Sequence, residues 1–276
     1  MSGEQQAGHG TGRFETVEFT RDGGVARVAL NRPDRMNAWS TAVSAEMLTI
    51  LGEVKDDDSV RALLITGNGR GFCAGADLKD SGAPSAEGGP GINTDVVLRD
   101  GYHPIVTALR ELEKPVVTAV NGPAAGAGVS LALAGDIVVA AESAYFLLAF
   151  TRIGLVPDGG SSIFVPARVG FARAAELALL ADRLPAAKAV EWGLINFAWP
   201  DAEFAAKTDE LVHKLASGPT RAYAGVKREL NHWLYSQLAA QLNLEADIQR
   251  DLSKSVDFAE GVAAFNEKRP AHFTGA

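Results

Sequence analysis

The sequence predicts an α/β fold followed by a C-terminal helical region. Three short apolar runs, 62–66, 115–120 and 136–140, have the length and composition of buried strands. Segments with helical spacing alternate with these runs, which favours a parallel sheet covered on both faces. From Ala202 onward the pattern is almost wholly helical. We therefore expect an α/β core over 14–199 and a helical region over 200–276, with the boundary near Trp199-Pro200.

The first predicted strand, 25–30, ends at the sequence Asn31-Arg32-Pro33. A helix is expected after Ser40, whose hydroxyl suits an N-cap. Apolar residues recur there at helical spacing: Val43, Met47, Ile50, Leu51 and Val54. The strand 62–66 stops at Gly67, and the last helix of the chain is expected to end at Pro270.

The stretch between Lys114 and Asp136 carries no charge and passes a length test of about 18 residues for a membrane span. Asn121, Gly122 and Pro123 interrupt it, and Ala and Gly fill much of it. It is better explained as a buried strand, a turn and a helix over 129–134. No membrane partner is therefore expected.

Two segments are rich in small or polar residues. Residues 1–13 are polar and Gly-rich, without the apolar run of a secretory signal, and are predicted to be a mobile tail. Residues 81–94 are rich in Gly, Pro and Ser and are predicted to form a mobile loop. This loop is either a lid over a pocket or a plain connection, and the sequence favours neither.

Composition excludes several classes of protein. The net charge of −8 argues against a nucleic-acid surface, which needs a basic face. A single cysteine excludes an intramolecular disulfide framework and fits a reducing compartment, so a cytoplasmic location is expected. The chain has no dinucleotide fingerprint, no phosphate loop and no Cys/His metal spacing, so no metal is expected.

Two kinds of nucleophile remain open as minor alternatives. A Ser-His-Asp triad could use Ser130, although nothing in the sequence specifies which His would serve. Cys73 could act as a nucleophile, but a lone Cys between Phe72 and Ala74, without an obvious base, is more often a packing residue.

Two loops consist mainly of small residues. Residues 71–78 and 121–128 each follow an apolar strand, and the second runs into the predicted helix. Small residues let a ligand approach the backbone, and a helix N-terminus offers unpaired N–H groups. Together the loops could direct two donors at one developing oxyanion. Close packing of strand on helix also requires Gly and Ala, so both interpretations stay open here.

Over about 14–274 the sequence resembles the crotonase (enoyl-CoA hydratase/isomerase) superfamily. The matching motifs are Asn31-Arg32-Pro33, Met36-Asn37-Ala38, Gly71-Phe72-Cys73-Ala74-Gly75-Ala76-Asp77, Asn121-Gly122, Gly126-Ala127-Gly128, Asp136-Ile137 and Ile153-Gly154-Leu155-Val156-Pro157-Asp158-Gly159-Gly160. The resemblance implies the crotonase (ClpP-like) fold, a spiral of ββα units. It also implies that the backbone N–H groups of Ala76 and Ala127 form the oxyanion hole, and that the carbonyl of Ala74 meets the adenine of coenzyme A.

The resemblance further indicates a base. Family hydratases hold a water with two Glu residues, and the matching positions here are Ser130 and Phe150. Family isomerases with an Asp at the position of Asp158 use it as the base, although an Asp there also suits a helix N-cap. Apolar neighbours would raise the pKa of Asp158 and make it a better base. The expected neighbours are Phe146, Phe150, Ile153 and Val156.

Other residues are implied to contact the substrate through the same matches. They are Asp77, Leu78, Gly126, Ser130, Phe150 and Pro157. A polyanionic coenzyme also needs cations, and the candidates are Arg32, Arg35, Lys268 and Arg269. Each could instead be an ordinary exposed charge, and Lys268 and Arg269 also complement a helix C-terminus. Coenzyme A would enter as part of the substrate, with no permanently bound cofactor. The family forms trimers and hexamers, so a homo-oligomer is expected.

The expected activity is isomerisation of an acyl-CoA thioester, either an enoyl-CoA or a ring-epoxyphenylacetyl-CoA, in fatty acid metabolism or phenylacetate catabolism. The alternatives are an enoyl-CoA hydratase (a lyase), a thioesterase and, from a different class, a non-catalytic CoA-ester-binding subunit.

Overall fold

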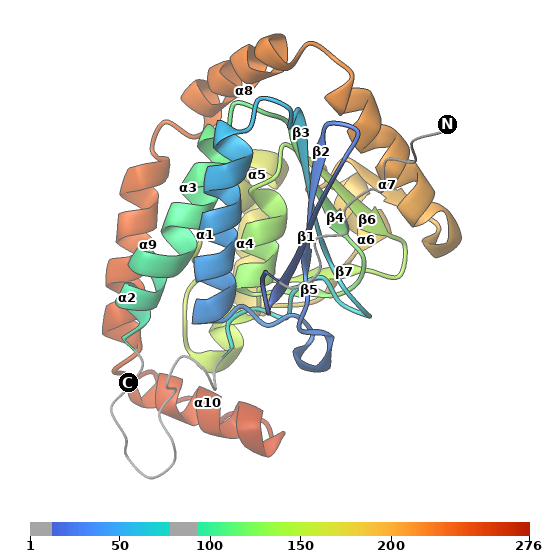
Figure 1. Cartoon of the computed structure of the whole chain (residues 1–276). Coiled ribbons are helices and arrows are strands. Elements are labelled where there is room, and N and C mark those ends of the chain that lie inside the picture. Colours follow the sequence, from blue (N-terminus) through green and yellow to red (C-terminus); the bar gives the residue numbers. More distant parts are fainter. Residues whose placement is uncertain (1–12, 78–92) are drawn as a thin grey trace, which may run out of the picture.

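The computed structural model describes residues 13–77 and 93–276, which are built around a six-stranded sheet (Figure 1). The strand order is β1-β2-β3-β4-β6-β9; β1 is antiparallel to β2, and all other neighbours are parallel. The strands are β1 (Val17–Asp22), β2 (Val25–Leu30), β3 (Ala62–Gly67), β4 (Val116–Val120), β6 (Ile137–Ala141) and β9 (Phe197–Trp199). The four predicted strands correspond to β2, β3, β4 and β6 within one residue at each end.

A second, three-stranded sheet contains β5 (Ala124–Ala125), β7 (Tyr145–Leu147) and β8 (Leu184–Pro185). Each of two successive turns of the chain adds one strand to each sheet and then forms a helix. The first turn is β4, β5 and α4 (Ala127–Leu133), and the second is β6, β7 and, after a short 3₁₀ turn, α5 (Ser161–Leu180). This is the expected spiral of ββα units.

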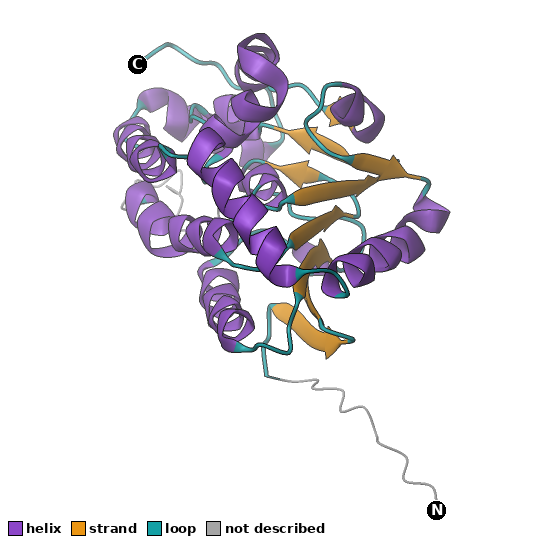
Figure 2. Cartoon of the chain, turned by 90° about the horizontal axis from the view of Figure 1, so that it is seen from above, coloured by secondary structure: helices purple, strands orange, loops and turns teal. Residues whose placement is uncertain are grey.

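Helices lie on both faces of the large sheet (Figures 1 and 2). Helices α1 (Thr41–Asp56), α3 (His103–Glu111) and α4 cover one face, and α7 (Asp201–Ala216) covers the other. Successive side chains of a strand point to opposite faces of its sheet, so the side chains of β3 pack on both sides. Leu63 and Ile65 belong to the larger core, whereas Leu64 packs in a second cluster with Val212 of α7.

Helix α1 has the start and the buried face that the sequence predicted. The Ser40 side chain accepts a hydrogen bond from the Val43 amide at 3.3 Å. All five apolar residues of the predicted spacing are buried. The further short helical elements are η1 (Pro33–Arg35), α2 (Thr94–Val97), the π-helical turn η2 (Leu98–Tyr102), η3 (Ala149–Ile153) and α6 (Ala186–Glu191).

The uncharged stretch 115–135 forms a strand, a turn and a helix as expected. Helix α4 begins at Ala127, two residues before the predicted start, because Gly126 turns the chain with φ 50° and leaves the next residue in helical conformation. No helix in the described part of the chain is long and apolar enough to cross a membrane.

The elements after residue 200 are all helical: α7, α8 (Thr220–Leu234), α9 (Leu238–Leu252) and α10 (Val256–Glu267). Helix α9 packs on α2 and α5, and α10 packs on η3. The prediction that Pro270 ends the last helix was wrong, because Lys268 already leaves the helix in the left-handed conformation with φ 55°. The division at residue 200 into two regions stays a prediction.

Two predicted mobile segments lie almost wholly outside the described residues. Of the tail 1–13, only Arg13 is described, and it forms an ion pair with Glu53 at 2.6 Å. Of the loop 81–94, only Asn93 and Thr94 are described, and Thr94 begins α2.

Candidate active site

A cavity of about 470 Å³ opens at the edge of the large sheet where β3 and β4 end. Most of its wall is apolar. Its lining residues are Arg35, Met36, Ala38, Ala74, Gly75, Ala76, Asp77, Ala125, Gly126, Ala127, Leu147, Ala149, Phe150, Arg152, Ile153, Leu155, Asp158, Phe265 and Asn266. Residues far apart in the sequence therefore meet here, from the first turn after β2 to helix α10.

The two small-residue loops lie against each other in this wall. They leave the same edge of the sheet because β3 and β4 are parallel neighbours. The Ala125 amide donates to the Cys73 carbonyl at 2.9 Å. Gly75 has φ 96°, and a Cβ there would lie 2.9 Å from the Ala125 carbonyl oxygen, so only glycine fits.

The backbone N–H groups of Ala76 and Ala127 both belong to this cavity. Trp39 binds the residues on either side of Ala76, donating to the Gly75 carbonyl at 2.7 Å and accepting from the Asp77 amide at 2.9 Å. Ala127 is the first residue of α4, where a helix has unpaired N–H groups. Neither alanine amide donates to a protein acceptor within residues 13–77 and 93–276.

The same loops also pack closely, so both interpretations of the small residues hold at different positions. A Cβ at Gly122 would lie 2.3 Å from the Arg70 carbonyl oxygen, and one at Gly128 would lie 2.2 Å from that of Cys73. Gly122 and Gly128 are therefore packing residues, whereas Gly75 and Gly126 shape the chain around the two free amides.

Asp158 lies in the turn before α5, with its side chain buried at the cavity wall. The hydroxyls of Ser130 and Ser161 donate to its backbone carbonyl at 2.7 and 2.8 Å. Its Oδ2 accepts from the Gln249 side-chain amide at 2.9 Å. Its Oδ1 is buried and has no hydrogen-bond partner among the described residues.

The pKa of Asp158 is raised well above the usual range of a carboxyl group. Burial is the main cause, the nearby Glu245 carboxylate adds to it, and the Gln249 hydrogen bond opposes it. Glu245, on α9, is itself buried, and burial raises its pKa also. The sequence predicted the direction of the shift and its main cause but not the second carboxylate.

The apolar neighbours of Asp158 differ in part from those expected. Phe150 and Ile153 line the cavity with it, but Phe146 and Val156 are not among the lining residues. Side chains alternate along β7, so Leu147 faces the cavity while Phe146 enters the core. The backbone carbonyl of Val156 accepts from Gln249 at 2.7 Å.

Ser130 and Phe150 have different surroundings. Phe150, on η3, lies against the cavity. Ser130, on α4, is fully buried and is not among the lining residues; it holds the Asp158 turn through the carbonyl described above. Because its hydroxyl donates to that carbonyl, the Ser-His-Asp alternative has no support here.

Cys73 is a packing residue. It is fully buried, and burial raises the pKa of its thiol to about 12, so it is not a thiolate at neutral pH.

The predicted phosphate-binding cations are dispersed. Arg35 lines the cavity, but Arg32 is bound to the Asp77 carboxylate and the Ala38 carbonyl, each at 2.7 Å. Lys268 caps α10 outside the lining residues, and Arg269 pairs with Glu260 and Glu267. The roles given to these cations stay predictions.

The other predicted contacts also have places in the structure. Ala74, Asp77 and Gly126 line the cavity, whereas Pro157 does not. Leu78 lies outside the described residues.

The sequence analysis gave no site role to several residues found here, among them Arg152, Glu245, Gln249, Phe265 and Asn266. Arg152 lies on η3 and lines the cavity, as do Phe265 and Asn266 of α10. A signal for two of them was present. Glu245 and Gln249 lie on the buried face of α9 together with Leu242 and Ala246, and polar residues are uncommon on such a face.

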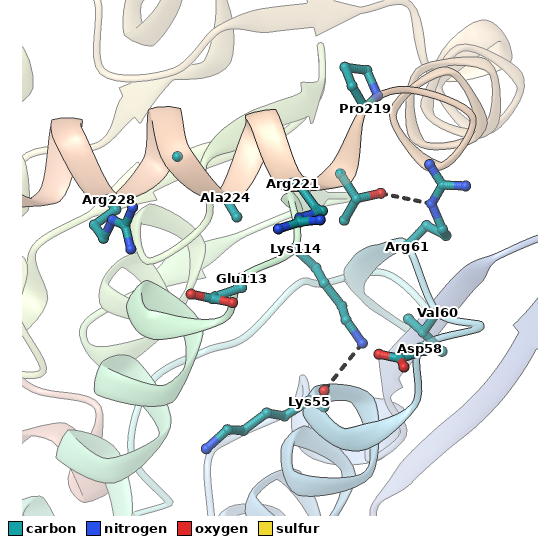
Figure 3. A pocket seen from close by; sticks show the side chains of 12 residues that line it. Lys55, Asp58, Val60, Arg61, Glu113, Lys114, Pro219, Arg221, Ala224 and Arg228 are labelled. Atoms are coloured by element: carbon teal, nitrogen blue, oxygen red, sulfur yellow. Dashed lines mark hydrogen bonds between the residues drawn. The ribbon is translucent and has the colours of Figure 1, made fainter.

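A larger cavity, of about 820 Å³, lies at the opposite edge of the sheet, before β3 and β4 begin (Figure 3). Its wall is charged, with Arg221 and Arg228 on one side and Lys55 on the other. Lys114 donates to the Asp57 carbonyl at 2.7 Å and Arg61 to the Thr220 hydroxyl at 2.7 Å. Lys114 thus links the end of α1 to the start of β4, and Arg61 links the start of β3 to α8. This cavity contains neither of the free alanine amides.

Comparisons with known proteins give one consistent family. The profile of the enoyl-CoA hydratase/isomerase family matches residues 20–276. The chain is 45% identical over 262 residues to a probable enoyl-CoA hydratase of Rhodobacter capsulatus, covering 95% of this chain and 99% of the relative. It is 44% identical over 252 residues to the 1,2-epoxyphenylacetyl-CoA isomerase of Escherichia coli, covering 91% and 95%. The crystal structure of an enoyl-CoA hydratase from Mycobacterium avium subsp. paratuberculosis matches with a TM-score of 0.86 at 40% identity, covering 95% of this chain and 99% of the other.

Proposed function

The chain belongs to the enoyl-CoA hydratase/isomerase family, within the crotonase superfamily, and from this premise we propose that it is an acyl-CoA thioester isomerase with Asp158 as its base. One observation supports this most. Two carboxylates line the described part of the cavity, and Asp77 is paired with Arg32. Asp158 has no cation partner among the described residues and keeps one oxygen unpartnered.

The two free amides supply the first part of the mechanism. A thioester carbonyl oxygen placed between the N–H groups of Ala76 and Ala127 accepts both hydrogen bonds. The bonds strengthen as the oxygen gains negative charge, so they stabilise the enolate more than the ground state. The carbon next to the carbonyl thereby becomes acidic enough for a carboxylate to deprotonate.

Asp158 supplies the second part. With a 3-enoyl thioester, its Oδ1 takes a proton from C2, and the electron pair delocalises over C2–C4 and the carbonyl oxygen. The same carboxyl then returns the proton to C4, and the double bond moves from C3–C4 to C2–C3. The raised pKa strengthens the ionised Asp158 as a base for this step.

The cavity wall supports isomerisation over hydration. The resemblance places the two water-binding Glu residues of family hydratases at Ser130 and Phe150, and neither of these side chains is a carboxylate. Phe150, Leu147, Ile153 and Leu155 give the acyl group an apolar wall. Proton transfer between two carbon atoms of a substrate in such an apolar cavity does not require a water molecule.

A hydratase is the second candidate, because a relative at 45% identity is named a probable enoyl-CoA hydratase. The experiment that separates the candidates offers 3-enoyl-CoA, 2-enoyl-CoA and ring-1,2-epoxyphenylacetyl-CoA, separates the products by chromatography and weighs each by mass spectrometry. An isomerase forms a product of unchanged mass that is separated from the substrate. A product heavier by one water would contradict our proposal, and free coenzyme A would indicate a thioesterase. Binding without turnover of any of the three would indicate a non-catalytic subunit.

The proposed cofactor requirement is simple. Coenzyme A is part of the substrate, and we propose no resident cofactor or metal. Arg35 and Arg152, both on the cavity wall, are the cations suited to its phosphates. Retention on immobilised coenzyme A should weaken when both arginines are replaced by Gln.

We also propose a homo-oligomer, a trimer or hexamer, in the cytoplasm. Large exposed apolar side chains support the assembly, including Phe171 at 84% and Trp233 at 82% exposure. Light scattering should give three or six times 29.0 kDa. The relatives' names support a role in fatty acid or phenylacetate breakdown.

A further inference from the structure

Helix α9 contacts the Asp158 turn through two buried polar side chains. Gln249 and Glu245 lie one helical turn apart, and their exposed fractions are 1% and 2%. The Gln249 side-chain amide donates to Asp158 Oδ2 at 2.9 Å and to the Val156 carbonyl at 2.7 Å. Two residues of the last helical region thus reach the group that we propose as the base.

Glu245 holds the other end of the same turn. Its carboxylate accepts the amide of Gly160 at 2.9 Å, the amide of Ser162 at 3.2 Å and the hydroxyl of Ser162. These donors are at the N-terminus of α5, where a helix favours negative charge. These hydrogen bonds and the helix N-terminus stabilise the Glu245 carboxylate, which has no cation partner among the described residues.

Burying two neighbouring carboxyl groups costs folding free energy, and a turn with only a structural role does not need both of them. The groups packed against Asp158 are Ser130 from α4, Ser161 from α5, and Glu245 and Gln249 from α9. Glu245 bonds the Asp158 turn through the amides of Gly160 and Ser162, and its negative charge raises the pKa of Asp158. It disfavours the ionised form, whereas the Gln249 donor favours it.

We propose that Glu245 and Gln249 are positioning residues that fix the Asp158 turn and its Oδ2, so that Oδ1 is the carboxylate oxygen left to exchange a proton with the substrate. The inference rests on the proposed role of Asp158 as base. Gln249 occupies Oδ2, so Oδ1 is the oxygen left for the substrate. Glu245 fixes the turn through Gly160 and Ser162 and places a second negative charge beside the base.

Glutamine can hold Oδ2 of Asp158 without adding a charge. Its Nε2 donates to the carboxylate, which favours the ionised form of Asp158. A lysine at this position would add a positive charge, and an ionised glutamate would add a negative one.

The test compares Glu245→Gln and Gln249→Met with a matched control, Gln241→Ala. Gln241 lies on the same helix and donates to the Ser162 hydroxyl at 2.8 Å but does not touch Asp158. The readouts are kcat, KM and the pH dependence of kcat/KM for 3-enoyl-CoA isomerisation.

The two variants should shift the acidic limb of the pH profile in opposite directions. Loss of the Glu245 charge moves it to lower pH by about one unit. Loss of the Gln249 donor moves it to higher pH and lowers kcat about 10-fold with KM nearly unchanged. The control should leave the limb in place. A weakened fold would not produce opposite shifts. Unmoved limbs, or shifts in the same direction, would overturn the proposal.

A second measurement separates this inference from the proposed reaction. In protein carrying ¹³C-labelled aspartate, the carboxyl signal of Asp158 is identified by its loss in Asp158→Asn and titrated in each variant. Opposite shifts without any isomerisation would keep the positioning role and reject the isomerase. If Gln249→Met does not fold, Gln249→Leu replaces it; it also lacks the donor, adds no charge, and should also move the titration to higher pH.

Discussion

At the scale of the residue, Asp158 shows how the chain keeps a buried carboxyl group in place. Two serine hydroxyls hold its backbone carbonyl, and one amide holds Oδ2. Burial and a neighbouring negative charge raise its pKa. A proton bound to carbon is difficult to remove, so a base with a higher proton affinity accepts it more readily.

Replacing Asp158 by Asn should leave binding of an acyl-CoA ester intact and reduce isomerisation by at least ~10²-fold. The amide keeps the size and hydrogen bonding of the side chain but cannot accept the substrate proton. Isothermal titration with a saturated acyl-CoA checks binding, and a product assay checks turnover. Near-normal turnover in this variant would reject Asp158 as the base.

A proline at position 127 should remove one donor with little damage to the helix. Ala127 is the first residue of α4, where proline is tolerated because its missing N–H is not needed there. The preceding Gly126 has no side chain to meet the ring. We expect kcat to fall about 10²–10³-fold. Ala127→Gly keeps the donor and serves as the control. Equal kcat in the two variants, both shown to be folded by circular dichroism, would count against the amide.

Sequence analysis assigned roles only where its motifs resemble those of the family. Ala76, Ala127 and Asp158 stand in such motifs, and their roles stay predictions. Glu245 and Gln249 could not be placed in the same way. Spacing on α9 shows that they face inward, but it does not show which turn they meet, and Asp158 is 91 positions before Gln249.

At the scale of the element, the reliability of the predicted fold followed strand length and burial. Strands β3, β4 and β6 were predicted because burial on both faces leaves a continuous apolar run, and β2 was predicted although Arg27 interrupts its run. Strand β1 is as long as β2 but mostly exposed, and it was not predicted. Strands β5 and β8 have two residues each and are too short to show a period. In α5, Pro166 and Gly170 interrupt the pattern, and Gly170 does leave the helical conformation, with φ 76° and ψ 170°.

Contact between α10 and η3 should be sensitive to a single methyl group. A Cβ at Gly261 would lie 2.6 Å from Ile153 Cα, which is backbone and cannot move aside alone. Gly261→Ala should therefore lower the free energy of unfolding by about 1–3 kcal/mol and disturb the wall that carries Phe150. Urea denaturation and kcat/KM measure both effects.

The matched control for that variant is Gly225→Ala in α8. A Cβ there meets nothing within 4 Å, and the position is inside a helix. This substitution should raise the free energy of unfolding by about 0.4–1 kcal/mol. If both substitutions changed the free energy of unfolding equally, contact with Ile153 would not restrict the packing of α10.

At the scale of the whole molecule, one buried histidine should contribute to sensitivity to acid. Burial, with the Arg99 charge, lowers the pKa of His103 from 6.5 to about 4. Between these two values the unfolded chain binds a proton that the folded chain does not, so stability falls as the pH falls from 6.5 towards 4. The loss should be of order 1–3 kcal/mol.

Replacing His103 by Leu should remove that part of the acid sensitivity. Urea denaturation at pH 7 and pH 4.5 gives the difference for wild type and variant. His232→Gln, at an exposed position on α8, is the control. The raised pKa values of Asp158 and Glu245 act in the opposite direction, but they are common to all three proteins and cancel in the comparison. Identical acid sensitivity of wild type and His103→Leu would contradict this prediction.

The late position of α9 and α10 in the chain has a consequence for synthesis. A ribosome adding about 5–20 residues per second needs roughly 5–18 s to pass from Asp158 to Gln249. During that interval the nascent protein already contains both alanine amides and the aspartate, but the helices that restrain and enclose them have not emerged. A polypeptide released early, before α9, would thus carry the groups that we propose as reactive without the order needed to use them, and premature termination would give an inert product.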